Sequence, residues 1–339
     1  MKILVLGGTG VISRVLVEQL LVAGHEVTVY NRGRSNSMAR TDSPVRVMVG
    51  DRLERQAFED AMTKEQFDVV IDMICFTAED AKSTLRAFRQ RVQQIVVVSS
   101  IAAYKRPYRT IPTQESAEEL FDDVRFEYSF HKAEMERVLW RAIQEGDQPV
   151  TIIRPSLTYG IGGLNIGVLR QNAGIVDRIR KGKPLVMFGD GTNPWNFTFV
   201  PDLVKAFVGI VGNSKTFGQA YHVTNDDVHM WEDLYLEFGR VVGKEPRIVH
   251  LPTELLYRAD PALFGHFFFE KMYAGLFDNS KIQRDVPSYK AEVSLRAGLE
   301  MMVDWYERAK LPVDAQKDAL EDQLAAMHQQ WMEQISTHL

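Results

Sequence analysis

Tyr128 and Lys132 stand four residues apart in the segment Tyr128-Ser129-Phe130-His131-Lys132. In a helix this spacing puts both side chains on one face. An ammonium group beside a phenol stabilises the phenolate and lowers a pKa that starts near ~10. The pair could therefore move a proton at neutral pH. Because the same spacing occurs by chance in many helices, the interpretation needs support from neighbouring groups.

Two serines could complete such a site. Ser99 and Ser100 follow Ile95-Val96-Val97-Val98, an apolar, β-branched run that predicts a buried strand. A hydroxyl at the end of this strand could hold a substrate carbonyl or hydroxyl. The alternative is that the serines cap a turn or a helix.

The start of the chain could bind a phosphate-bearing cofactor. Gly7-Gly8-Thr9-Gly10-Val11-Ile12-Ser13 follows one predicted strand and opens a predicted helix. Glycines permit a tight turn in which backbone N–H groups approach a pyrophosphate, and a helix N-terminus adds partial positive charge. Ser13 stands where a last glycine is usual, and a plain strand–helix turn is the alternative. The expected cofactor contacts are Gly7, Thr9, Gly10, Val11 and Ile12.

The residues after the second predicted strand favour NADP over NAD. An acidic side chain about 20 residues beyond the glycines would hold the ribose 2′-hydroxyl of NAD. Here the chain reads Asn31-Arg32-Gly33-Arg34 instead. Guanidinium groups suit a 2′-phosphate, so we expect Asn31, Arg32 and Arg34 to contact the cofactor. The alternative is that the arginines are solvated loop charges.

Asp51 and Arg52 come just after the third predicted strand. We expect both at the cofactor, where Asp51 could accept a hydrogen bond from the adenine amino group. Asp51 could also cap the helix that follows, and the two roles are compatible.

Short apolar runs alternate with amphipathic stretches through the first two-thirds of the chain. This alternation predicts an α/β fold with a parallel, doubly wound sheet of the Rossmann type, whose strands end at one ligand-binding edge. The expected, mostly buried strands are Ile3–Leu6, Val27–Tyr30, Val45–Val49, Val69–Met73, Ile95–Val98 and Val150–Ile153.

The pattern changes after Gly163, where helical stretches dominate. We expect a Rossmann domain over residues 1–160 and a smaller, mostly helical substrate lobe over residues 161–310, with some segments returning to the Rossmann domain. Residues 311–339 should form an amphipathic helix that docks on its own domain, the alternative being a partner or subunit contact. Its apolar stripe is Leu320, Leu324, Met327, Trp331 and Ile335.

Composition narrows the class of protein. The chain has 339 residues and a net charge of −5 with interspersed signs, which gives no general attraction to nucleic acid or to a membrane surface. Cys75 is its single cysteine, which excludes an internal disulfide and suits a reducing compartment. With no long apolar run either, we expect a cytoplasmic protein. The spacing of the histidines predicts no metal site.

Taken together, the motifs resemble the short-chain dehydrogenase/reductase superfamily, in its extended branch of NAD-dependent epimerases and dehydratases. The resemblance covers most of residues 1–308. In chain order it is carried by Gly7-xx-Gly10-xx-Ser13, Asp51, Ser100 with Tyr104, Tyr128-xxx-Lys132, Arg154-Pro155-Ser156-Leu157-Thr158-Tyr159-Gly160, Gly189-Asp190-Gly191, Phe197–Leu203 and Asn279–Ile282.

The resemblance implies roles for these residues. Tyr128 would be the general acid/base, Lys132 would bind the nicotinamide ribose and tune Tyr128, and Ser100 would orient the reacting oxygen. The resemblance also implies a homodimer. Further cofactor contacts would be Met73, Ile74, Cys75, Ser99, Pro155 and Ser156, and substrate contacts would be Thr77, Tyr104 and Trp195.

Two departures from the family pattern bear on the substrate. Trp195-Asn196-Phe197 stands where an arginine is common in enzymes of nucleotide sugars, although Arg170, Arg178, Arg180 and Lys183 lie nearby in the sequence. In addition, Ile71–Phe76 and Asn31-Arg32-Gly33 are similar to an atypical subgroup related to chloroplast stem-loop-binding proteins.

These observations lead to one main hypothesis and one alternative. The main hypothesis is an NAD(P)-dependent epimerase, dehydratase or reductase that acts on a sugar-like or other hydroxylated small molecule, including a nucleotide sugar. The alternative is a non-catalytic RNA-binding or cofactor-sensing protein on the same fold.

Overall fold

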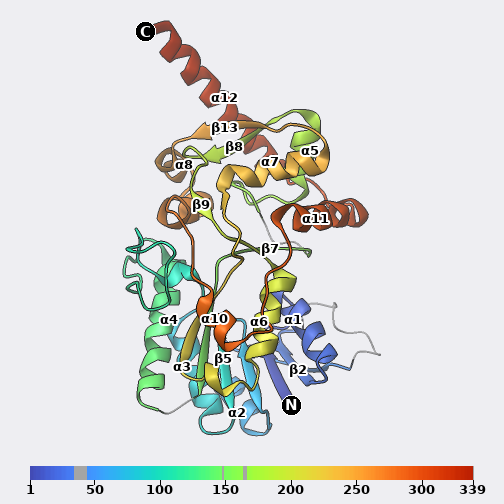
Figure 1. The fold of residues 1–339 in the computed structure, drawn as a ribbon, viewed down its shortest axis with the longest axis vertical. Helices are drawn as coiled ribbons and strands as arrows, with labels where there is room; N and C mark the ends of the chain where they lie inside the picture. The colour runs from blue at the N-terminus through green and yellow to red at the C-terminus, as the bar shows by residue number, and fades with distance from the viewer. Residues whose placement is uncertain (34–43, 147–148, 163–165, 339) are drawn as a thin grey trace.

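A seven-stranded parallel sheet forms the centre of the computed structural model, which describes residues 1–33, 44–146, 149–162 and 166–338 (Figure 1). The strand order is β11-β6-β5-β4-β1-β2-β3. All neighbours pair in parallel, so every strand ends at the same edge. The strands are β1 (Lys2–Leu6), β2 (Glu26–Asn31), β3 (Arg46–Val49), β4 (Val69–Asp72), β5 (Gln94–Val98), β6 (Val150–Pro155) and β11 (Gln219–Val223).

Helices cover both faces of this sheet, as expected for a doubly wound fold. On one face lie α1 (Val11–Val22), α6 (Val200–Ile210) and α10 (Ser280–Asp285), which share a hydrophobic core with the strands. On the other lie α2 (Arg55–Thr63), α3 (Ala78–Phe88) and α4 (Glu127–Gln144). The chain thus returns to the Rossmann sheet with α6, β11 and α10, after it has entered the second lobe.

The second lobe has its own hydrophobic core around Trp195, Trp231 and Phe188. Three short strand pairs and a set of helices surround it (Figure 1). The strand pairs are β7 (Leu157–Tyr159) with β10 (Phe197–Phe199), β8 (Pro184–Phe188) with β13 (Arg247–Leu251), and β9 (Pro194–Trp195) with β12 (His229–Met230). The helices of this lobe are α5 (Ala173–Lys181), α7 (Trp231–Val242), α8 (Thr253–Ala259), α9 (Pro261–His266), the π-helical η4 (Phe267–Lys271), α11 (Leu295–Ala309) and α12 (Ala315–His338). Two short 3₁₀ helices complete the list: η2 (Ile101–Ala103) follows β5, and η3 (Ser214–Thr216) precedes β11.

All six strands predicted from apolar runs are present, and the predicted fold class is confirmed. Two details differ. β3 is an edge strand whose residues are mostly exposed rather than buried. β11 was not predicted, because Gln219-Ala220-Tyr221-His222-Val223 mixes polar and apolar residues. His222 is fully buried in this strand, where its imidazole forms a hydrogen bond of 2.6 Å with the Tyr104 hydroxyl.

The predicted C-terminal helix is present as α12, and it docks on its own lobe only over its first half. Leu324 is buried, and the buried Arg178 holds this half through Glu321 at 3.1 Å and Asp322 at 2.8 Å. The second half projects from the body, and Trp331 and Ile335 on it are exposed (Figure 1). No helix among the described residues is long and apolar enough to cross a membrane.

Candidate active site

The loop between β1 and α1 is a tight turn that only glycine can make. Gly7 has a φ of +83°, and a Cβ on it would lie 2.4 Å from Ile74 Cγ2. A Cβ on Gly8 would lie 2.2 Å from Val29 Cγ1. Both distances are far below contact, so a side chain at either position would displace β2 or the segment after β4. The sequence needs these glycines to bring the start of α1 to the sheet edge.

A cleft of about 540 Å³ opens in front of this turn. Gly10 caps α1 without any side-chain hydrogen bond, so the first N–H groups of the helix remain available to an anion. An elongated cofactor with a pyrophosphate fits this set of donors. Among the predicted contacts, the cleft is lined by Gly7, Thr9, Gly10, Val11, Ile12, Asn31, Arg32, Asp51, Arg52, Met73 and Ile74.

At the ribose end of the cleft, the structure separates the predicted roles. Arg32 is exposed, and Asn31 uses its Oδ1 to accept from the Gly33 N–H at 2.8 Å. Arg34 lies outside the described residues. Asp51 Oδ1 accepts from the Leu53 N–H at 3.0 Å, and α2 begins only at Arg55. Asp51 therefore forms a local turn at the cleft, and the expectation that it caps α2 is wrong.

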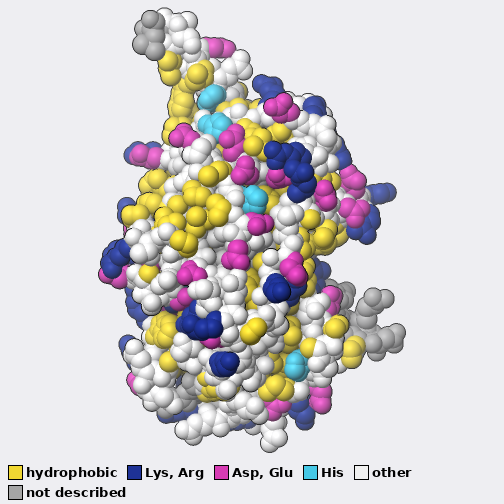
Figure 2. Space-filling view, in the orientation of Figure 1, with side chains coloured by type: hydrophobic (Ala, Val, Ile, Leu, Met, Phe, Trp, Pro, Cys, Tyr) yellow, Lys and Arg dark blue, Asp and Glu magenta, His cyan; other side chains and the backbone are white. Residues whose placement is uncertain are grey.

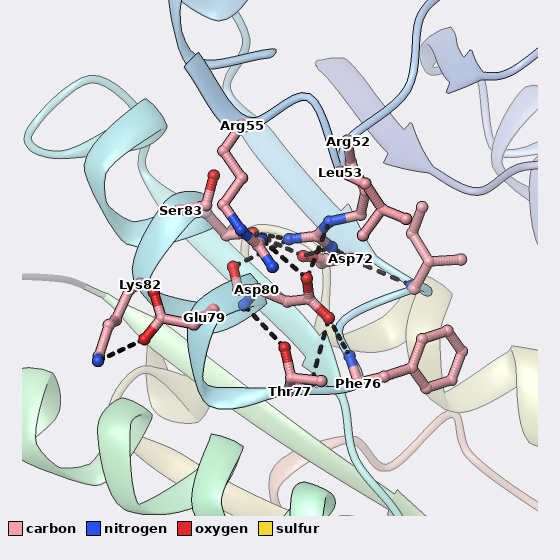
Figure 3. A network of polar contacts seen from close by, with 12 residues as sticks. Arg52, Leu53, Arg55, Asp72, Phe76, Thr77, Glu79, Asp80, Lys82 and Ser83 are labelled. Atoms are coloured by element: carbon pink, nitrogen blue, oxygen red, sulfur yellow. Dashed lines mark hydrogen bonds and ion pairs between the residues drawn. The ribbon is translucent and has the colours of Figure 1, made fainter. Parts of the chain in front are cut away.

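Arg52 belongs to a buried ion network behind the cleft (Figure 3). Its Nη1 donates to both Asp72 oxygens at 2.8 Å, and Nη2 donates to the Asp80 carbonyl and Thr84. Arg55 pairs with Asp80 at 2.9 Å. The charge of the Arg52 guanidinium is thus already paired, while Arg52 also lines the cleft, and its contact with the cofactor stays a prediction.

The residues predicted to transfer a proton lie at the carboxyl edge of the sheet. Ser100 lies two residues beyond the end of β5 and caps η2 by accepting from the Ala102 N–H at 3.1 Å. Tyr128 lies in the first turn of α4, and Ser100 is near enough to act on the pKa of its hydroxyl. The Tyr128 side chain is 37% exposed as a whole.

Lys132 lies one turn along α4 from Tyr128 and is buried. Its Nζ donates to the Cys75 carbonyl at 2.7 Å and to the Val98 carbonyl at 2.8 Å, and the Phe76 ring lies 4.8 Å away. The ammonium thus joins the ends of β4 and β5 on the floor of the site. Burial lowers the pKa of Lys132 to about 8.

The Tyr128 phenol is less acidic than the Tyr-Lys spacing predicts. Burial of the hydroxyl and the nearby Glu270 carboxylate raise its pKa to about 12, against a small opposing effect of Ser100 and Arg170. The expected lowering by Lys132 is wrong for this state of the molecule, because the Lys132 ammonium is directed at two backbone carbonyls. The Tyr128 hydroxyl is accordingly protonated at neutral pH.

Comparison with known proteins decides the family. A sequence profile of the NAD dependent epimerase/dehydratase family matches residues 3–224. The chain belongs to this family. Membership makes it an NAD-dependent enzyme of the epimerase/dehydratase type.

Proteins similar to this chain are named for different functions. The chain is 28% identical to 2′-dehydrokanamycin reductase of Streptomyces kanamyceticus, over 86% of this chain and 80% of that protein. It is 27% identical to the chloroplast stem-loop binding protein of 41 kDa b of Arabidopsis thaliana, over 79% and 71%. The fold is similar to UDP-glucuronic acid 4-epimerase from Bacillus cereus in complex with NAD, with a TM-score of 0.73, 18% identity and coverage of 92% and 100%.

Several side chains that the family resemblance assigns to ligands point into the protein instead. Tyr104 is fully buried, with its hydroxyl 2.6 Å from both His222 Nε2 and Arg154 Nη1. Trp195 is also fully buried in the core of the second lobe. Ser99 donates to the buried Glu136 at 2.5 Å. The predictions of substrate contacts for Tyr104 and Trp195, and of a cofactor contact for the Ser99 hydroxyl, are therefore corrected.

The other residues that the family resemblance assigns to ligands lie around the site, and they differ in which of their atoms are free to contact a ligand. The Cys75 thiol is buried, and only its carbonyl faces Lys132. Thr77 is half-buried and caps α3 by accepting from the Asp80 N–H at 3.2 Å. Pro155 ends β6 and is buried. The Ser156 hydroxyl is buried against the Asn196 carbonyl and Thr198.

One group near Tyr128 has no counterpart in the sequence prediction. Glu270 and Lys271 form a buried ion pair in η4, and the His266 ring centroid lies 5.6 Å from that of Tyr128. In the sequence they directly follow the aromatic run Phe264–Phe269. This run indicates a core segment, so the two charged residues at its end were not predicted to be part of a site. An adjacent acidic and basic residue within such an apolar run is the signal that could have found them.

Proposed function

We propose that the chain transfers hydride between a nicotinamide cofactor and a hydroxyl- or carbonyl-bearing carbon of a sugar-like small molecule. The observation that carries the proposal is the position of Ser100, after β5, and Tyr128, in the first turn of α4, whose side chains interact at the sheet edge where the dinucleotide cleft lies. The bound nicotinamide would supply or accept the hydride. A proton must then move at the substrate oxygen, and Tyr128 is the accessible group that can exchange it.

Each residue of the proposed site has a separate task. Tyr128 donates its proton to the substrate oxygen during reduction, because its raised pKa keeps the hydroxyl protonated. Ser100 orients that oxygen through its own hydroxyl. Lys132 holds the ends of β4 and β5 in place and presents its charge at the ribose side of the cofactor.

NADP is the proposed cofactor, within a family that uses NAD. Arg32 lines the cleft at the end of β2, and Tyr30-Asn31-Arg32-Gly33 offers no carboxylate for a ribose 2′-hydroxyl. A guanidinium group favours the 2′-phosphate of NADP. The similarity to proteins named for 2′-dehydrokanamycin and for UDP-glucuronic acid supports a hydroxylated substrate.

A non-catalytic RNA-binding protein is the second candidate, since the chain is similar to a chloroplast stem-loop binding protein. RNA binding requires a continuous basic surface. On the face drawn in Figure 2, lysines and arginines are interspersed with acidic residues. Strong RNA affinity that falls steeply with salt would favour this candidate.

Substitution of Tyr128 by phenylalanine tests the proposal, because it removes only the reacting hydroxyl. We expect Tyr128→Phe to bind NADPH like the wild type and to lose roughly 10²–10⁴ of its turnover. Turnover would be measured as NADPH oxidation with a carbonyl compound identified by screening the wild-type protein. Tyr306→Phe, a matched change in α11, should retain full turnover. Equal turnover of Tyr128→Phe and the wild type would refute the proposal.

A further inference from the structure

Glu136 and Arg154 form a buried ion pair that joins α4 to β6. Glu136 lies on α4 one helical turn beyond Lys132 and two turns beyond Tyr128, so the three side chains follow one side of the helix. Glu136 is fully buried, and Arg154 is 2% exposed. The Arg154 Nε donates to Glu136 Oε1 at 2.9 Å, and its Nη2 donates to Oε2. The contact is therefore bidentate.

The same carboxylate also holds the end of β5. Ser99 donates its hydroxyl to Glu136 Oε1 at 2.5 Å. Ser99 stands between Val98, whose carbonyl accepts from Lys132 Nζ at 2.8 Å, and Ser100. The residues on both sides of Ser99 thus take part in the proposed site, and Glu136 fixes the strand end that carries them.

Buried groups hold the Arg154 guanidinium from its other side. Its Nη1 donates to the Tyr104 hydroxyl at 2.6 Å and to the Glu115 carbonyl at 3.0 Å, and its Cζ lies 4.7 Å from the centre of the Tyr104 ring. The same hydroxyl lies 2.6 Å from His222 Nε2 on β11. Burial and the Arg154 charge lower the pKa of His222 to about 3, so this imidazole is a neutral hydrogen-bond partner. The direction of the guanidinium is therefore fixed on both sides.

Stability alone does not account for a buried pair at this place. Replacement of such a pair by apolar residues of similar volume is often neutral or stabilising, because desolvation of the two charges offsets their attraction. An apolar contact lets a helix slide on a sheet, whereas a bidentate contact fixes the distance and the direction of both partners. The pair is thus suited to a helix that must keep one position on the sheet.

We propose that Glu136 and Arg154 are positioning residues, which hold α4 so that Tyr128 and Ser100 face the same substrate oxygen. Both are buried and neither lines the cofactor cleft, so they act through the residues that they hold. Misplacement of a reacting group by about 1 Å can lower turnover roughly 10²-fold. The inference rests on the proposed function, because it takes Tyr128 as the proton donor.

The double variant Glu136→Met/Arg154→Met tests the proposal, because it removes both charges and fills the space with flexible apolar side chains. We expect urea unfolding and the Kd for NADPH to stay close to the wild-type values, while kcat falls roughly 10–10²-fold. Amide hydrogen exchange of residues 127–132, followed by mass spectrometry without substrate, should become about tenfold faster. The control Arg178→Met/Glu321→Met removes a buried pair between α5 and α12 and should change neither kcat nor this exchange.

Arg154→Lys supplies a second variant should the double variant fail to fold. It keeps the charge but loses the bidentate contact, so we expect kcat to fall about tenfold and the exchange of residues 127–132 to rise. Wild-type kcat or wild-type exchange in either folded variant would overturn the proposal, as would an equal loss of kcat in the control. Equal turnover of Tyr128→Phe and wild type refutes the proposed function instead, and the exchange measurement then still reports on the pair.

Discussion

Two groups of charged residues flank the reaction site, and they differ in balance. Behind the cofactor cleft, Arg52 and Arg55 face Asp72 and Asp80, and each charge meets an opposite one (Figure 3). Beside Tyr128, among the described residues, Lys271 and the nearby Arg106 share the carboxylate of Glu270. A balanced group can hold elements together without any ligand, whereas an unbalanced one awaits a counter-charge. The first group therefore indicates a structural role, whereas the second keeps a surplus of positive charge beside Tyr128.

The largest expected effect concerns the balanced group. Asp72→Ala leaves the buried Arg52 guanidinium without its partner, and we expect the free energy of unfolding to fall by about 3–5 kcal/mol. Urea unfolding followed by circular dichroism measures the loss. Glu79→Ala, which breaks the exposed pair with Lys82 on the same helix, should cost far less, because solvent screens this pair.

This prediction also separates the two groups. Added phosphate should not restore the stability of Asp72→Ala, because no ligand site opens there. Recovery of that variant by phosphate, or a loss no larger than that of Glu79→Ala, would remove the distinction between the two groups.

A smaller effect, on cofactor affinity, is expected from substitution of Arg32, an exposed cation at the rim of the cofactor cleft. Arg32→Gln should weaken NADPH binding about tenfold, because an ionic contact to the 2′-phosphate is lost, and should leave NADH binding unchanged. Enhancement of nicotinamide fluorescence on binding measures both affinities. Unfolding in urea should be unaffected. Equal losses for both cofactors would contradict the assignment of Arg32 to the 2′-phosphate.

The smallest effect is expected in the pH profile of the reductive reaction. Burial raises the pKa of Tyr128 to about 12, so this donor keeps its proton across the neutral range. Burial lowers the pKa of Lys132 to about 8, so its charge is lost as the pH rises above that value. The kcat should therefore vary less than about twofold from pH 6 to 7 and fall above about pH 8. A fall centred near pH 7 or lower would show that Tyr128 is acidic after all.

The strands and the glycine turn of the Rossmann domain could be predicted in detail, because each depends on a local sequence pattern. Apolar runs give the strands, and Gly7 to Ser13 give the turn, since each of these depends on neighbours in the chain. Arg52 and Asp72 are 20 residues apart, and only the packing of α2 and α3 against β4 brings them together. The role of Arg52 could thus not be read from its position beside Asp51.

The substrate half depends on contacts between distant segments. Trp195 looked like a residue of the ligand site, but Trp231 and Phe277 pack on it and leave it fully buried. Glu270 and Lys271 reach Tyr128 only because η4 folds back onto α4. The adjacent Glu270 and Lys271 could have been noticed in the sequence, but local patterns do not show which distant segment they contact, so their position beside Tyr128 emerged from the structure.

The central claim, hydride transfer assisted by Tyr128, is tested most directly by following the hydrogen itself. NADPH deuterated at the transferring position of the nicotinamide is incubated with wild-type protein and a carbonyl compound that it reduces, and the product is examined by mass spectrometry. We predict one deuterium in the product of the wild-type protein and none above background with Tyr128→Phe, although both proteins bind the cofactor equally. Deuterium transfer by Tyr128→Phe at the wild-type rate would contradict the account.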